Sequence, residues 1–74
     1  AELVATVHAA WNNLLLDGKK PSEDDIVHEA RENWHSDKLK IPRHEFIEAL
    51  ARIRRENIMP KGMGKRVTGQ EVLL

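Results

Sequence analysis

The sequence contains no cysteine, which excludes two common means of stabilising a small domain. Without thiols the chain forms neither a disulfide framework nor a cysteine-based zinc site. A chain of 74 residues buries only about 60% of the surface that it exposes when unfolded, so apolar packing must supply its stability. Lack of cysteine also fits a reducing compartment, and we therefore expect a cytoplasmic protein.

Long apolar runs are missing as well. No run approaches the roughly 20 residues that a membrane-spanning helix needs, and no basic and then apolar leader opens the chain. We therefore expect no membrane partner. The chain begins at Ala1 instead of methionine, and we expect a single small domain over residues 1–74, either complete or a fragment of a longer protein.

Net charge is zero, but the charges are divided unequally along the chain. Residues 1–37 carry three Lys or Arg and eight Asp or Glu, whereas residues 38–74 carry nine and four. This asymmetry has two interpretations. Either the basic half meets a polyanion, or the acidic half pairs with the basic half inside the fold.

Apolar residues at helical spacing predict a first amphipathic helix over residues 2–16. Its apolar stripe comprises Leu3, Val7, Ala10, Trp11 and Leu14. Gly18 is expected to end it, because glycine adopts the left-handed conformation of a helix end without steric cost.

A second helix is predicted to begin after Ser22 and to fade around His35 or Ser36. Ser22 is a favourable N-cap, and the carboxylates of "SEDD" lie in the first turn, where each stabilises the helix by ~0.3–1 kcal/mol. Paired-acid catalysis is disfavoured for them, because a general acid needs a pKa raised by burial or by a like-charged neighbour.

A third helix is predicted to begin after Pro42 and to run through residue 56. Its apolar stripe comprises Phe46, Ile47, Leu50 and Ile53, and the apolar share of 41% is too high for a disordered chain. We expect five residues at the centre of the core: Trp11, Trp34, Phe46, Leu50 and Ile53.

Two segments favour extended structure. "DKLKI" alternates polar and apolar residues, which predicts a short strand at 38–41 or an extended linker. Residues 59–74 have apolar ends around a glycine-rich middle, typical of a β-hairpin that turns at 61–64 or at 68–70, or of a flexible basic tail. The predicted fold class is mainly α, a three-helix core with a small C-terminal β-hairpin.

Few residues suggest site chemistry. His28, Glu32 and His35 share one side of the second helix and could bind a divalent metal, but the "HExxH" order is missing and a solvated face is favoured. A solvated face is also favoured for His44 with Glu48. "KGMGK" lacks the pattern of a nucleotide-binding loop, and no nucleophile is spaced to meet a base. We predict no metal, no cofactor and no enzyme activity.

Three helices followed by a glycine-containing basic hairpin resemble a winged-helix domain. "PRHEFIEALARIRRENI" (residues 42–58) is similar to the recognition helix, and "MPKGMGKRVTG" (residues 59–69) is similar to the wing. The resemblance implies a domain that binds duplex DNA with this helix in the major groove and the wing along the backbone. Many domains of this family serve instead as protein-contact modules.

The predicted function is therefore nucleic-acid binding through backbone contacts of the basic C-terminal half. The residues predicted to make these contacts are Lys38, Lys40, Arg54, Arg55, Lys61, Lys65 and Arg66. The alternative is a protein-interaction or dimerisation module of a larger protein. It is favoured by apolar residues that do not all fit a three-helix core, namely Leu16, Met59, Met63, Val72, Leu73 and Leu74.

Overall fold

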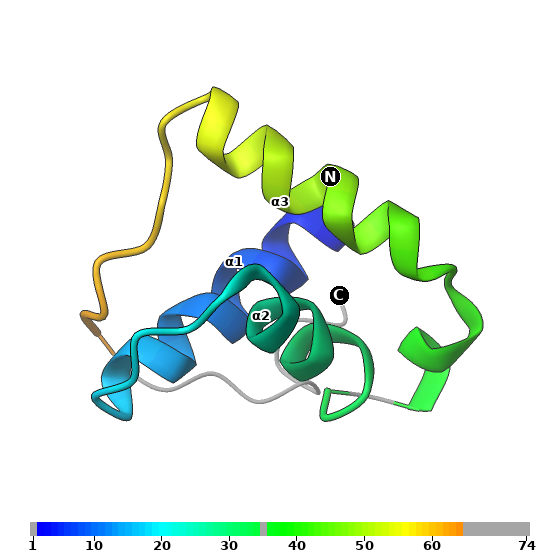
Figure 1. Ribbon diagram of the computed structural model, residues 1–74, viewed down its shortest axis with the longest axis horizontal. Helices are drawn as coiled ribbons and strands as arrows, with labels where there is room; N and C mark the ends of the chain where they lie inside the picture. The colour runs from blue at the N-terminus through cyan, green and yellow to red at the C-terminus, as the bar shows by residue number, and fades with distance from the viewer. Residues whose placement is uncertain (1, 35, 65–74) are drawn as a thin grey trace.

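The computed structural model describes residues 2–34 and 36–64. They form three α-helices and one 3-10 helix: α1 (Glu2–Leu16), α2 (Glu23–Arg31), η1 (Ser36–Lys40) and α3 (Arg43–Arg55). Each α-helix contacts the other two (Figure 1). The predicted mainly helical class with a three-helix core is confirmed.

The core comes from one apolar face of each α-helix. Its buried apolar residues are Val7, Ala10, Leu14, Ile26, Val27, Ala30, Phe46, Ala49, Leu50 and Ile53. The central position predicted for Phe46, Leu50 and Ile53 is thus confirmed. The place predicted for Ile47 in the same apolar stripe is wrong, because Ile47 lies at the edge of that helix face and is 44% exposed. Trp11 and Trp34 are only partly buried and pack at the edge of this core, as is common for tryptophan, whose large side chain is rarely fully buried.

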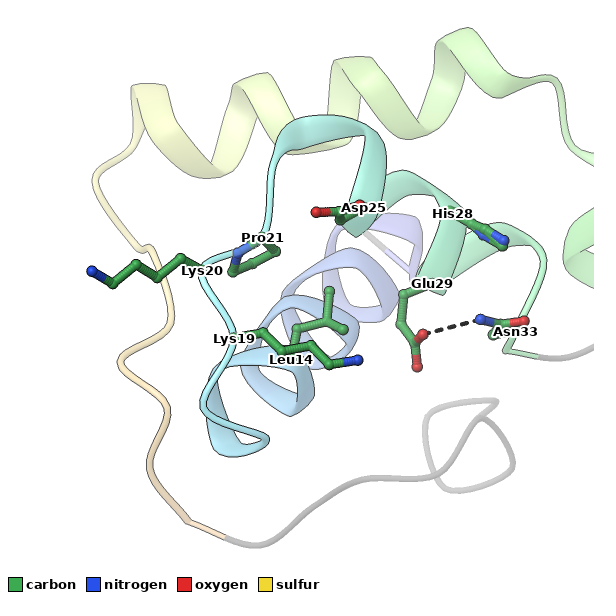
Figure 2. Close-up of a pocket in the computed structure, with 8 residues that line it drawn as sticks. All are labelled: Leu14, Lys19, Lys20, Pro21, Asp25, His28, Glu29 and Asn33. Carbon is green, nitrogen blue, oxygen red and sulfur yellow. Dashed lines mark hydrogen bonds between the residues drawn. The ribbon is translucent and has the colours of Figure 1, made fainter.

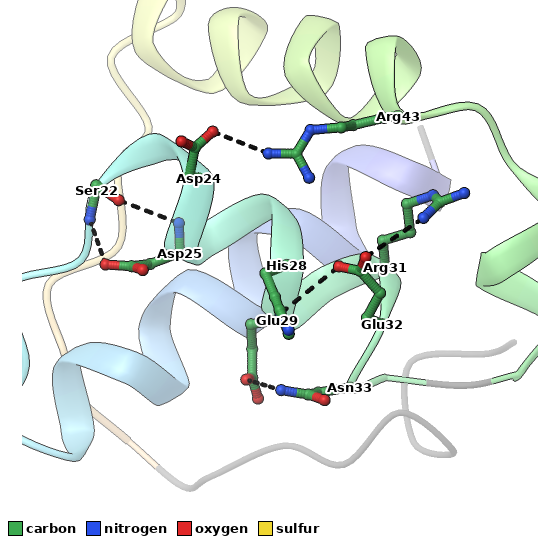
Figure 3. Close-up of polar contacts among 9 residues, drawn as sticks. All are labelled: Ser22, Asp24, Asp25, His28, Glu29, Arg31, Glu32, Asn33 and Arg43. Atoms are coloured by element: carbon green, nitrogen blue, oxygen red, sulfur yellow. Dashed lines mark hydrogen bonds and ion pairs between the residues drawn. The ribbon is translucent and has the colours of Figure 1, made fainter.

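Helix α2 begins with the predicted cap. Ser22 Oγ accepts a hydrogen bond from the backbone N–H of Asp25 at 3.2 Å, and Asp25 Oδ2 accepts one from the N–H of Ser22 at 3.0 Å (Figure 3). This reciprocal capping box satisfies two backbone donors that a helix start otherwise leaves unpaired.

The predicted end of α2 around His35 or Ser36 is wrong, because the helix stops at Arg31. The chain then turns through residues 32–34, where Asn33 has a low intrinsic helix propensity. The Arg31 side chain holds the turned chain in place. Its Nε donates to the carbonyl of Ile41 at 3.0 Å and its Nη2 to the carbonyl of Leu39 at 3.3 Å.

The strand predicted at 38–41 is also wrong. Residues 38–40 belong to η1, and the N–H of Ile41, the next residue, donates to the carbonyl of Lys38 at 3.1 Å, a bond over three residues. A single alternation of two apolar residues is too short to specify a strand. The part of the chain that the structure describes also offers no neighbouring strand with which to pair.

Two helices end in the same way. At the end of α1, Gly18 has a φ of 79°, and the backbone N–H of Lys19 donates to the carbonyl of Leu14 at 3.1 Å. The predicted end of this helix is thus confirmed. At the end of α3, Asn57 has a φ of 57°, and the backbone N–H of Ile58 donates to the carbonyl of Ile53 at 3.1 Å. Both ends are Schellman motifs, and asparagine takes the place of glycine in the second.

The predicted C-terminal hairpin is not supported. Residues 59–64 are irregular, and no strand occurs within residues 2–34 and 36–64. Pro60 has no N–H to donate to a ladder, and Gly62 and Gly64 both have positive φ. The alternative turn at 68–70 and the rest of the predicted hairpin or tail, residues 65–74, lie outside the described residues.

Candidate interaction surfaces

Two arginines of α3 meet the acidic start of α2. Arg54 Nη1 lies 2.5 Å from Glu23 Oε2, and Arg43 Nη2 lies 2.8 Å from Asp24 Oδ1. Figure 3 shows Arg43 reaching from the start of α3 to Asp24. Of the two interpretations of the charge asymmetry, pairing of the acidic half with the basic half therefore holds at both of these contacts.

Arg54 also lies over an aromatic ring of α1. Its Cζ is 5.7 Å from the centre of the Trp11 ring, within the distance of a cation–π interaction. One guanidinium group thus contacts a carboxylate of α2 and an indole of α1. The position of Arg54 is consequently fixed by the packing of all three helices.

The other residues predicted to bind nucleic acid lie apart. Lys38 is 4% exposed, and Lys40 Nζ lies 3.9 Å from Asp37 Oδ1. Both precede α3, whereas Arg54 and Arg55 end it, about 20 Å away along the helix.

Two further cations of the predicted set are exposed. Among the contacts of residues 2–34 and 36–64, neither Arg55 nor Lys61 has an ion pair. Lys65 and Arg66 lie outside the described residues. The described members of the set therefore do not form one continuous patch.

Residues 58–64, here called the C-terminal strap, return from the end of α3 to α1 (Figure 1). Asn12 holds the strap with three hydrogen bonds. Its Oδ1 accepts from the N–H groups of Gly62 at 2.8 Å and Met63 at 3.2 Å, and its Nδ2 donates to the carbonyl of Met63 at 3.0 Å. Sequence reasoning missed this contact, because an asparagine inside a helix gives no sign of a partner fifty residues away.

The strap presents large apolar side chains to solvent. Ile58 and Met59 are exposed, and Met63 is 71% exposed. A shallow groove beside them is lined by residues of α1 and of the strap: His8, Ala9, Asn12, Met59, Pro60, Lys61 and Met63. Methionine adapts its shape to different apolar surfaces, so this edge is suited to contact with another protein.

A second groove runs between the start of α1 and α3. Its apolar floor comes from Leu3, Val4 and Ala49, and its remaining lining residues are Glu45, Glu48, Ala51, Arg52 and Arg55. Arg52 Nε donates to Glu56 Oε2 at 2.8 Å. The groove therefore joins apolar surface to charges of both signs.

A polar hollow lies between the end of α1, the following loop and α2 (Figure 2). Lys19 points into it, whereas Lys20 points away from the other labelled residues. Glu29 accepts a hydrogen bond from Asn33 at 3.2 Å. The hydrogen bonds of the capping box, above all the one from the backbone of Ser22, hold the pKa of Asp25 below its ordinary value.

The side chains of α2 that were considered as metal ligands make ion-pair contacts within the chain. His28 Nδ1 lies 3.6 Å from Glu32 Oε2, and Arg31 Nη1 lies 3.6 Å from Glu32 Oε1 (Figure 3). His35 lies outside the described residues. Within those residues no group of three or more His, Asp or Glu side chains is placed to hold a metal ion.

Comparison of the chain with protein-family models, curated proteins and solved structures found no match. The winged-helix resemblance therefore stays a prediction. None of the helices described is both long and apolar enough to span a membrane.

Proposed function

We propose that this domain is a non-catalytic protein-interaction module. The observation that carries the proposal is that guanidinium groups of α3 pair with carboxylates of α2. The surfaces that stay exposed are apolar or carry charges of both signs. A surface that attracts a polyanion needs cations free of carboxylates. A protein partner instead needs exposed apolar area beside polar groups of both signs.

Nucleic-acid binding is the second candidate. The observation in its favour is that the exposed side chains of Arg55 and Lys61 have no carboxylate partner among the described residues. Lys61 also begins the basic run that continues with Lys65 and Arg66. Under this hypothesis these residues contact phosphates of the duplex backbone.

The two candidates are separated by titrating labelled duplex DNA at two salt concentrations. Each phosphate neutralised steepens the slope of log K against log[salt] by about 0.9, so several contacts give a measurable slope. If the domain is a protein-interaction module, we expect no binding above the background of a neutral protein, even at low salt.

The double variant Lys65→Glu with Arg66→Glu sharpens this test. Steep salt dependence in the wild type, abolished in the double variant at unchanged melting temperature, would overturn the protein-interaction proposal. The melting temperature is the check that the double variant still folds, since a substitution at an exposed site usually alters stability by no more than about 0.5 kcal/mol. The absence of enzyme activity and the cytoplasmic location expected from the sequence stay predictions.

A further inference from the structure

Four charged residues of α3 form one exposed stripe. Glu45, Glu48, Arg52 and Arg55 are spaced by three, four and three residues, so they lie on the same side of the helix. The two acids occupy the first half of the stripe and the two bases the second half. This stripe, here called the α3 stripe, borders the groove beside Leu3 and Val4.

Most charged groups of the α3 stripe remain available for contacts with another molecule. Arg43 and Arg54, which pair with α2, lie outside the stripe. In the described part of the chain no ion pair or hydrogen bond is made by the side chains of Glu45, Glu48 and Arg55. Arg52 uses its Nε for Glu56, which leaves its Nη groups available as donors.

The charges of the stripe are complementary to those of a second, antiparallel copy of the same stripe. Glu45 and Arg55 are equally far from Leu50 along the helix, and so are Glu48 and Arg52. If two copies of α3 lie antiparallel with their Leu50 positions level, each glutamate faces an arginine of the other copy. A parallel arrangement would instead place acid against acid and base against base.

We propose that the α3 stripe and its groove bind a second copy of this chain, with the two α3 helices antiparallel about a two-fold axis level with Leu50. Glu45 then pairs with Arg55 of the other copy, and Glu48 with Arg52. Two-fold symmetry makes every such pair occur twice, once at each end of the interface. This inference rests on the proposed protein-interaction function and names the partner.

The groove beside the stripe also offers apolar surface. Leu3 and Val4 line this groove and are only half-buried. A second copy that covers the stripe therefore also covers these two side chains, which adds apolar contacts beside the ion pairs.

Charge favours a second copy over other occupants of this groove. A nucleic acid would bring its phosphates against Glu45 and Glu48. A strongly acidic or basic peptide would satisfy one half of the stripe and be repelled by the other half. A second copy satisfies both halves with the same residues.

The test measures molecular mass by sedimentation equilibrium up to about 1 mM protein. For the wild type we expect a mass that rises with concentration. Glu45→Arg and Arg55→Glu each turn two attractive pairs into repulsive ones, so each variant alone should raise the dimer Kd at least about tenfold. An equimolar mixture of the two variants should associate again, because Arg at 45 in one copy meets Glu at 55 in the other.

The matched control is Lys20→Glu, which changes net charge as Arg55→Glu does but lies far from the stripe. It should self-associate like the wild type. Circular dichroism of every variant should match the wild type, since the exchanged side chains are exposed.

Cysteine variants give a second readout. The chain has no native cysteine, and positions 45 and 55 are about 15 Å apart within one helix, too far for a disulfide. A mixture of Glu45→Cys with Arg55→Cys should therefore form a disulfide-linked dimer on oxidation. Either variant alone should not, because its two cysteines would lie at opposite ends of the interface.

The outcomes separate the inference from the proposed function. A constant monomer mass for the wild type overturns the inference, and the DNA titration then decides the function by itself. Self-association that responds to Arg55→Glu no more than to Lys20→Glu overturns the inference but leaves a protein-interaction module that uses another face.

Discussion

At the scale of single residues, Asn12 and Gly62 hold the C-terminal strap against α1. Asn12 bonds the backbone at Gly62 and Met63, and Gly62 adopts a φ of 69° that favours glycine. A Cβ built at Gly62 would lie 2.9 Å from the Cβ of Leu15, closer than real contacts allow. The strap therefore reaches Asn12 only because position 62 has no side chain.

Gly62→Ala should destabilise the strap for two reasons, the positive φ and the contact with Leu15. Gly64→Ala is the matched control, because Gly64 has a φ of 86° but no atom within 4 Å of an added Cβ. The backbone conformation alone costs roughly 1–2 kcal/mol at either position. We expect the amides of residues 62 and 63 to lose more hydrogen-exchange protection in Gly62→Ala than in Gly64→Ala. Equal losses would show that the contact with Leu15 is unimportant.

At the scale of the element, the stability of α2 depends on the cap at its N-terminus. The helix has only nine residues, which is too short to be stable alone, so its cap and its packing must hold it. The capping box of Ser22 and Asp25 satisfies backbone donors and places a negative charge at the positive end of the helix dipole.

The capping box predicts a pH dependence of stability. Because the folded-state pKa of Asp25 is lowered, its ionised form contributes stability above the unfolded pKa, and this contribution is lost as the pH falls through the folded pKa. Asp25→Asn should therefore be less stable than the wild type at neutral pH. The difference should shrink when urea denaturation is repeated below about pH 3, under the ordinary range of aspartate.

A difference between wild type and Asp25→Asn that stays constant from neutral to acid pH would contradict the role given to the capping box.

At the scale of the whole molecule, three helices share one small core without disulfides. Total stability for 74 residues is about 4–11 kcal/mol at typical values per residue. Phe46 is fully buried at the point where α3 meets the other two helices. Loss of one such ring removes a large fraction of this stability.

Phe46→Ala should cost about 3–5 kcal/mol and strongly lower the melting temperature. Ile47→Ala is the matched control, because Ile47 is the next residue of the same helix but is 44% exposed. Its cost should be well below that of Phe46→Ala. Thermal unfolding followed by circular dichroism measures both, and similar melting temperatures would contradict the position assigned to the core.

The sequence determined the local features of this protein. Helical periodicity, Ser22 and Gly18 specified three helices and two of their ends, because caps and amphipathic spacing act over a few neighbouring residues. Only the tertiary structure decided that the predicted strand at 38–41 is a 3-10 helix, that Arg54 meets Glu23 and Trp11, and that Asn12 holds the strap. These outcomes depend on contacts between residues far apart in the chain, and their free energies do not appear in any local pattern.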